Sequence, residues 1–287
     1  MSTDAMPGSG APVLQLGHSP DSDDAFMFYG LAQDLVETEG LRFVHILRDI
    51  QTLNEWAREG RLECTAISVH AYAYVHERYA ILTHGASMGD GYGPLVVARR
   101  PLTPADLAHV TIAVPGLLTS AFLALSLYLP SAFAYTVLPF DAIMPAVARG
   151  EVEAGLLIHE GQLTHGALGL TPVVDLGRWW KEETGLPLPL GVNAIRKDLP
   201  EEIRRRAGRA LKASIVYALQ HREQAVAHAM TYARDMDTQT ADTFVGMYVN
   251  AWTVDMGEAG RRSIQLFLDR GAERGLIPAV GAVEFVE

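Results

Sequence analysis

Four short apolar runs along the chain each lead into a segment whose apolar residues recur at helical spacing. Gly, Ser, Thr, Asp or Pro residues separate the two parts, which is the pattern of a β-strand followed by an α-helix. The predicted strands cover residues 13–17, 64–67, 110–114 and 154–158. In open α/β sheets ligands bind beyond the carboxyl ends of the strands. We therefore expect the residues that follow these four strands to line one crevice.

Two apolar stretches bounded by Gly and Pro, at residues 89–107 and 184–203, interrupt this series. Both contain a Pro-Leu step followed by apolar residues, and together they predict a pair of hinge strands. The chain leaves one lobe near Val96 and returns near Val192. The expected architecture is α/β with two lobes. Residues 100–191 form a smaller continuous lobe, and residues 1–99 with 192–287 form a larger discontinuous one, mainly helical after residue 199.

Composition narrows the possible partners and location. The 287 residues carry a formal net charge of −11, and the longest basic run is the triplet at 204–206, so nucleic acid is not an expected partner. Cys64 is the only cysteine, which rules out an intrachain disulfide and fits a reducing compartment. The sequence shows neither an export signal nor an apolar stretch of the roughly 18 residues that a membrane span requires. We expect a cytoplasmic protein.

Several polar residues follow the first predicted strand. Ser19, Ser22, Asp23 and Asp24 stand near a helix start. A solvated acidic cap explains them as well as a functional role does. Three crowded acids, Asp21, Asp23 and Asp24, would repel an anionic group directly above them, so hydroxyl donation or general acid–base work is the functional alternative.

Paired hydroxyls open the strongly apolar helix that follows the third strand. Thr119 and Ser120 stand where free backbone N–H groups and the positive end of the helix dipole form an anion site. This arrangement suits a substrate carboxylate, although a plain helix cap needs only one hydroxyl. Ser68, at the end of the second strand, occupies the matching position in the other lobe.

His159 ends the fourth strand and is the candidate base, since an imidazole titrates near a pKa of roughly 6.5. A structural histidine is the alternative. The spacing of His159, Glu160 and His165 matches no zinc motif, so no metal is expected. No phosphate-binding loop and no GxGxxG after a strand occur in the sequence, which argues against NTPase and dinucleotide chemistry.

Six stretches in order along the chain resemble the 1,4-dihydroxy-6-naphthoate synthase family of the futalosine route to menaquinone. They are the Gly-x-Ser-Pro opening at 17–20 with Asp24, TLNEWAREGRLE at 52–63, GYGPLVVAR at 91–99, VPGLLTSAFL at 114–123, GEVEAGLLIHE at 150–160 and TGLPLPLG at 184–191. The resemblance implies a fold like type 2 periplasmic binding proteins, in which two lobes enclose the ligand. It also implies a lyase that converts cyclic dehypoxanthine futalosine into 1,4-dihydroxy-6-naphthoate without a metal or organic cofactor, and a possible homodimer.

The resemblance further implies roles for individual residues. His159 is the expected proton acceptor, and Ser68, Thr119 and Ser120 are expected to contact a small carboxylate-bearing substrate. Ala66 and Ile67, which precede Ser68, belong to the same predicted pocket, as do Ser19 and Asp23. Two departures lie there: many members read SPCPNDTF where this chain has SPDSDDAF, and Thr-Lys-x-Ser where it has TAIS at 65–68. The alternatives are a chorismate dehydratase-like enzyme of the same pathway and a non-catalytic cytoplasmic binding protein for a small carboxylate.

Overall fold

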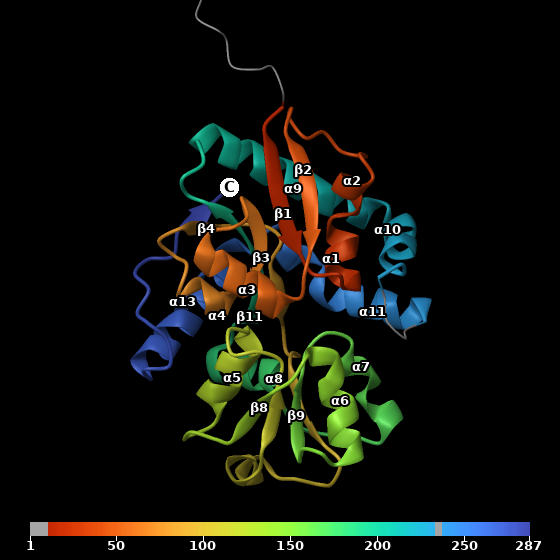
Figure 1. Cartoon of the computed structure of the whole chain (residues 1–287), viewed down its shortest axis with the longest axis vertical. Helices are drawn as coiled ribbons and strands as arrows, with labels where there is room; N and C mark the ends of the chain where they lie inside the picture. The colour runs from red at the N-terminus through yellow and green to blue at the C-terminus, as the bar shows by residue number, and fades with distance from the viewer. Residues whose placement is uncertain (1–10, 233–236) are drawn as a thin grey trace, which may run out of the picture.

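The computed structural model describes residues 11–232 and 237–287, which form two lobes, each built on one β-sheet (Figure 1). The first sheet has the order β12-β4-β11-β3-β1-β2, with β5 also paired to β11. Its strands are β1 (Val13–His18), β2 (Arg42–Leu47), β3 (Cys64–Ser68), β4 (Tyr79–Leu82), β5 (Ser87–Gly89), β11 (Leu188–Arg196) and β12 (Phe285–Val286). The second sheet has the order β10-β6-β9-β7-β8 and comprises β6 (Leu95–Ala98), β7 (Ile112–Val114), β8 (Tyr135–Val137), β9 (Ala154–Leu157) and β10 (Thr171–Asp175).

Helices cover both sheets, and the four predicted strand-to-helix units are all present. The first lobe carries α1 (Ser22–Met27), α2 (Tyr29–Ala32), α3 (Ile50–Glu59), α4 (Val69–Tyr72), α9 (Glu201–Gln220), α10 (Arg222–Ala229), α11 (Thr238–Tyr248), α12 (Ala251–Val254) and α13 (Gly257–Glu273). The second carries the 3-10 helix η1 (Pro104–His109), α5 (Ser120–Tyr128), α6 (Phe140–Arg149), α7 (Gly161–Thr164), η2 (His165–Leu168) and α8 (Leu176–Thr184). Among the described helices, none combines the length and apolar character that a bilayer crossing requires.

The chain passes between the two sheets twice. Sheet membership changes at residues 90–94 and again before Leu188, a few residues ahead of the expected divisions after residues 99 and 191. The reason is strand pairing: β6 lies between β9 and β10, and β11 lies between β3 and β4. At the first crossing the backbone packs tightly against α8, since a Cβ atom on Gly177 would lie 1.8 Å from the carbonyl oxygen of Tyr92.

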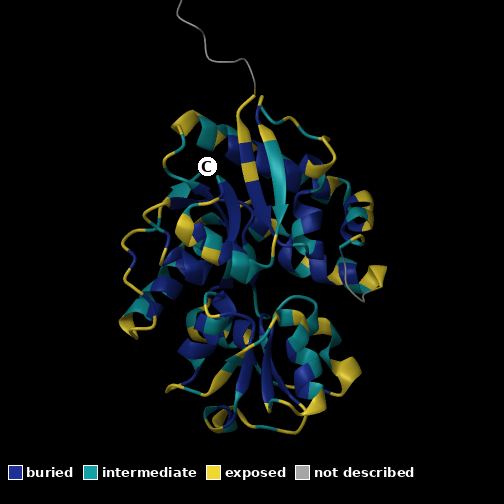
Figure 2. Ribbon diagram, in the orientation of Figure 1, coloured by how far each residue is buried: buried dark blue, intermediate teal, exposed yellow. Residues whose placement is uncertain are grey.

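One apolar core contains buried residues of both lobes, and Figure 2 shows buried segments on both sides of the boundary between them. Trp180 of α8 is buried there, with its ring 5.4 Å from that of Phe267 on α13 and its indole N–H donating to Ser263 Oγ at 3.2 Å. Arg274, just beyond α13, donates to the carbonyl oxygens of Leu127 and Leu129. Helix α13 therefore holds the second lobe against the first.

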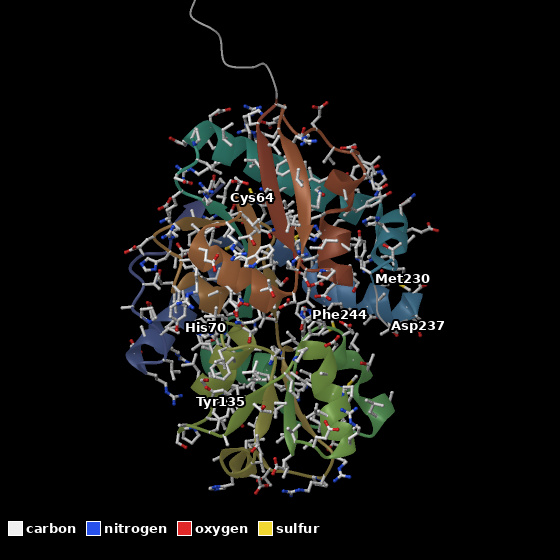
Figure 3. All side chains as sticks on the ribbon, viewed as in Figure 1. Cys64, His70, Tyr135, Met230, Asp237 and Phe244 are labelled. Carbon is white, nitrogen blue, oxygen red and sulfur yellow. The ribbon has the colours of Figure 1, made fainter. Side chains whose placement is uncertain are left out.

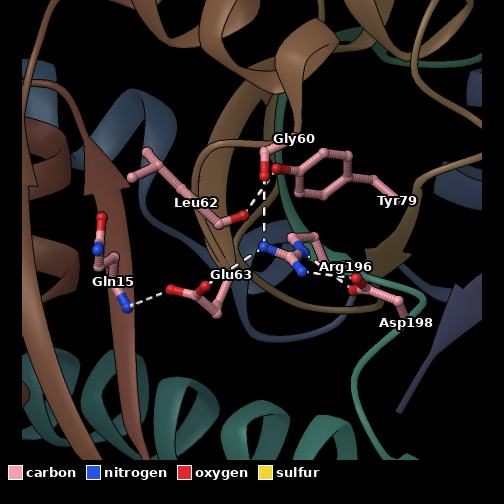
Figure 4. A network of polar contacts seen from close by, with 7 residues as sticks. All are labelled: Gln15, Gly60, Leu62, Glu63, Tyr79, Arg196 and Asp198. Carbon is pink, nitrogen blue, oxygen red and sulfur yellow. Dashed lines mark hydrogen bonds and ion pairs between the residues drawn. The ribbon is translucent and has the colours of Figure 1, made fainter.

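A polar network fastens the opposite end of the first sheet, where β1 and β3 begin (Figure 4). The guanidinium of Arg196 lies 3.4 Å from Glu63 Oε1, and Glu63 Oε2 accepts a hydrogen bond from the backbone N–H of Gln15 at 2.9 Å. The Tyr79 hydroxyl donates to the carbonyl oxygen of Leu62 at 2.7 Å. These bonds connect β1, β3, β4 and β11 at the ends of the strands away from the crevice.

Candidate active site

A cavity lies between the lobes, beyond the carboxyl ends of β1, β3, β7 and β9. The residues predicted from the sequence all line it: Ser19, Asp23, Ala66, Ile67, Ser68, Thr119, Ser120 and His159. Their roles in binding and proton transfer stay predictions. Among the described lining residues, none is a lysine or an arginine.

The C-terminal helices contribute residues that the sequence did not single out. Phe244 and Tyr248 of α11 line the cavity, and Phe244 lies at the boundary between the lobes (Figure 3). The Tyr248 hydroxyl donates to Gln162 Oε1 on α7 at 2.6 Å, and both side chains are buried. The i, i+4 spacing of the two aromatic residues indicated a core-facing helix, which gave no reason to place them at a ligand. Tyr248 and Gln162 thus join the two lobes beside the cavity.

Of the acidic residues after β1, Asp21 is buried, and Asp23 and Asp24 are half-buried at the cavity, unlike a solvated cap. The Ser19 hydroxyl donates to Asp21 Oδ2, and the Ser19 backbone N–H donates to Asp24 Oδ2 at 2.6 Å. Burial, reinforced by the charge of Asp21 and opposed by His159, raises the pKa of Asp23 to about 6. Burial and the charge of Asp23 raise the pKa of Asp24 well above its ordinary value. These two carboxyl groups therefore keep their protons to higher pH than ordinary aspartates do.

His159 follows β9 in a left-handed backbone conformation, with φ of 54°. Few residues other than glycine adopt this region, and the strain costs on the order of 1–3 kcal/mol. The imidazole lies edge-on to the Phe140 ring, with 4.8 Å between ring centres. Its Nδ1 atom is 3.2 Å from Asp21 Oδ2, which belongs to the other lobe. This contact connects a carboxylate of one lobe to an imidazole of the other.

Thr119 and Ser120 start α5 as expected, but both hydroxyl hydrogens are used within the protein. Thr119 caps the helix: its Oγ1 accepts from Phe122 N–H at 3.2 Å and donates to the carbonyl oxygen of Gly116 at 2.8 Å. Ser120 Oγ donates to the carbonyl oxygen of Leu190 at 2.5 Å and accepts from His70 N–H at 3.2 Å. The donors that remain at this helix start are backbone N–H groups of its first turn.

Ser68 stands where β3 extends past the end of β1, since the pairing of these strands stops at Thr65. The side chain of Asn54 bridges this gap: Asn54 Nδ2 donates to Ser68 Oγ at 3.0 Å, and Ser68 N–H donates to Asn54 Oδ1 at 2.8 Å. Ser68 Oγ accepts in this pair, so its own hydrogen is left for a second partner. Ala66 and Ile67 lie on the same open edge.

Asp21, Asp23 and His159 form a group of possible metal ligands within the described residues, with donor atoms within 4.8 Å of one another. Carboxylate oxygens and imidazole nitrogen suit a divalent cation. However, Asp21 Oδ2 already accepts from Ser19 and contacts His159 Nδ1. We assign no metal to this group, because its central oxygen is committed to these two partners.

Comparisons with known proteins identify relatives of this chain. Residues 14–273 match the family described as menaquinone biosynthesis. The 1,4-dihydroxy-6-naphtoate synthase of Thermus thermophilus is 44% identical over 264 residues, which cover 92% of this chain and 96% of that protein. The 1,4-dihydroxy-6-naphtoate synthase of Streptomyces coelicolor is 37% identical over 276 residues, which cover 94% and 97%.

Solved structures confirm the predicted periplasmic-binding-protein-like fold. Protein AF1704 from Archaeoglobus fulgidus superposes with a TM-score of 0.89 at 44% identity, covering 92% of this chain and 98% of that one. The alkanesulfonate-binding protein SsuA from Xanthomonas axonopodis pv. citri superposes with a TM-score of 0.71, covering 96% and 98%. Its identity is 11%, so this second likeness concerns the fold alone.

Proposed function

The chain belongs to the menaquinone-biosynthesis family, and from this premise we propose that it is a 1,4-dihydroxy-6-naphthoate synthase. Its substrate is then cyclic dehypoxanthine futalosine, and the reaction is a carbon lyase step that needs no cofactor. Two relatives that bear this enzyme name along nearly their whole length support the assignment. The cytoplasmic location and the homodimer stay predictions from the sequence.

The observation that carries the mechanism is the placement of His159 at the end of β9, within the cavity and against Asp21. A neutral imidazole in this position removes a proton from the bound substrate, after which the sugar-derived fragment leaves. The backbone of His159 is strained where it holds the ring in this position, as its positive φ indicates. Strain of this kind concentrates at functional sites, which favours a catalytic over a packing role.

The substrate carboxylate binds at the start of α5 in this proposal. Because no described lining residue is a lysine or arginine, backbone N–H groups and the helix dipole supply the positive potential. Ser68 Oγ donates a further hydrogen bond. Asp23 and Asp24, whose pKa values are raised, line the cavity and can donate to substrate oxygen atoms when they are protonated. This arrangement replaces the role first predicted for the hydroxyls of Thr119 and Ser120.

Turnover assays with two substrates test the proposal and its main alternative. Purified protein incubated with cyclic dehypoxanthine futalosine should release 1,4-dihydroxy-6-naphthoate, detected by mass spectrometry, and incubation with chorismate should give no dehydration product. Turnover of chorismate alone would establish the chorismate dehydratase-like alternative. Binding of the futalosine derivative without any turnover would establish the non-catalytic one.

The substitution His159→Asn tests the base. Asparagine accepts the left-handed backbone conformation better than most residues but cannot take up the proton. We expect kcat to fall by about 10²–10⁴-fold, with KM changed by no more than about threefold. His109→Asn, at an exposed histidine of the same lobe, is the matched control and should leave kcat unchanged. A folded His159→Asn protein with near-normal kcat would refute the base assignment.

A further inference from the structure

Resting on the proposed function, we infer that Asp21 of the first lobe is the positioning residue for the His159 base of the second lobe. The base then becomes competent only when the two lobes meet. The sequence alone does not suggest this pairing, because Asp21 and His159 stand 138 positions apart in the chain. Their contact exists because β1 and β9 end on opposite sides of one cavity.

The geometry of Asp21 supports a fixed orientation. Its side chain is only 3% exposed, and Oδ2 accepts from the Ser19 hydroxyl while lying 3.2 Å from His159 Nδ1. Asp21 precedes α1 but makes no capping bond to that helix, so capping does not account for the carboxylate. Its described partners are instead a hydroxyl of its own loop and the imidazole across the cavity.

The contact also determines which nitrogen of His159 accepts a proton. A carboxylate at Nδ1 favours the tautomer with hydrogen on Nδ1, because that hydrogen can be donated to Oδ2. Nε2 then holds the lone pair and is the basic atom. The carboxylate further stabilises the imidazolium that forms when Nε2 takes the proton. Among the described acidic groups, Asp21 and Asp23 lie close to His159, and the raised pKa of Asp23, about 6, leaves it partly protonated near that pH.

A double-mutant cycle tests the inference. Asp21→Asn keeps the size of the side chain but presents an amide that can donate to Nδ1 and favour the wrong tautomer. Since Asp21 acts through His159, we expect kcat to fall by at least about tenfold and by no more than in His159→Asn. KM should change by no more than about threefold. In the His159→Asn background, Asp21→Asn should have no further effect on the residual rate.

A matched control separates positioning from a general loosening of the lobes. Asp90 at the first crossing and Lys181 of α8 form an ion pair of 2.7 Å, but both are partly exposed and outside the cavity lining. Asp90→Asn should leave kcat within about twofold, because exposed ion pairs contribute little. Imidazole ¹⁵N chemical shifts of wild-type protein provide a readout that needs no catalysis, with His159→Asn identifying the signals. We expect His159 to carry its hydrogen on Nδ1.

The outcomes distinguish this inference from the proposed function. If His159→Asn abolishes turnover while Asp21→Asn retains normal kcat, the base stands and the positioning role is refuted. An equal loss of rate from Asp21→Asn in both backgrounds would mean that Asp21 is only structural. If the wild type turns over neither substrate, the proposed function fails, and the ¹⁵N shifts alone test whether Asp21 orients His159. A hydrogen found on Nε2 of His159 would then overturn this inference.

Discussion

Replacing Tyr248 by phenylalanine should weaken ligand binding, because it removes a hydrogen bond that exists only when the two lobes are together. The Tyr248 hydroxyl donates to Gln162 Oε1 at 2.6 Å, from α11 of the first lobe to α7 of the second. Tyr248→Phe keeps the aromatic ring but removes the hydroxyl, which leaves the buried side-chain oxygen Oε1 of Gln162 without this donor. Any separation of the lobes exposes both groups to water, so the penalty falls on the closed arrangement alone.

The magnitude follows from the burial of both partners. Leaving a buried acceptor unsatisfied costs about 1–3 kcal/mol. If the lobes separate in the free protein, this cost shifts the equilibrium away from the closed arrangement by roughly 5- to 150-fold. Because the ligand is enclosed between the lobes, its apparent Kd should rise by up to that factor. The chemical step does not use the bond, so kcat should change much less than Kd.

Tyr79→Phe is the matched control for this measurement. Tyr79 is buried as well and donates to the carbonyl oxygen of Leu62 at 2.7 Å, but both residues belong to the first lobe. Urea unfolding should show a loss of stability for both variants. Calorimetric titration with substrate or product should show weaker binding for Tyr248→Phe alone. Equal Kd values for wild type and Tyr248→Phe would refute the reasoning. An equal loss of ligand affinity in Tyr248→Phe and Tyr79→Phe would also refute it.

Two further predictions concern stability. Burial lowers the pKa of His18 to about 3 and of His70 and His84 to about 4, so only the unfolded chain binds these protons near pH 6. Each of these three histidines should therefore lower the free energy of unfolding by about 2 kcal/mol between pH 7 and pH 5. A midpoint of urea unfolding that stays the same between these two pH values would contradict this. Gly177→Ala should destabilise the protein by about 1–3 kcal/mol or more, because its Cβ would collide with the backbone of the first crossing. Gly166→Ala, with open space around its Cβ, should show no such loss in the same urea assay.

Much of this architecture is readable from the sequence because it depends on local patterns. A strand can be predicted from each of the four apolar runs, at 13–17, 64–67, 110–114 and 154–158. Because ligands bind beyond the carboxyl ends of parallel strands, the residues that follow these runs are expected to lie together. The pairing of β6 with β9 and β10 is different. The apolar stretch near Val96 predicts a strand but does not specify its partners, so the expected division came a few residues late.

The partners of the site residues depend on contacts across the cavity, and no local sequence pattern predicts such contacts. The sequence showed acids near the first helix but could not indicate that Asp21, rather than Asp23 or Asp24, reaches Nδ1 of His159. Likewise, the hydroxyl of Ser120 appeared suited to an anion. In the structure it bonds to the carbonyl oxygen of Leu190, a residue that approaches only after the two lobes have assembled.

The position of β11 between β3 and β4 has a consequence for synthesis on the ribosome. All five strands of the second sheet emerge one after another, so they can pair before translation ends. The first sheet must wait, because β3 and β4 cannot be joined until β11 has followed the whole second lobe out of the exit tunnel. Until then the nascent chain presents two open strand edges, which are favourable sites for aggregation. The lobe that starts first is completed last, and chaperone dependence during expression should originate in the N-terminal half.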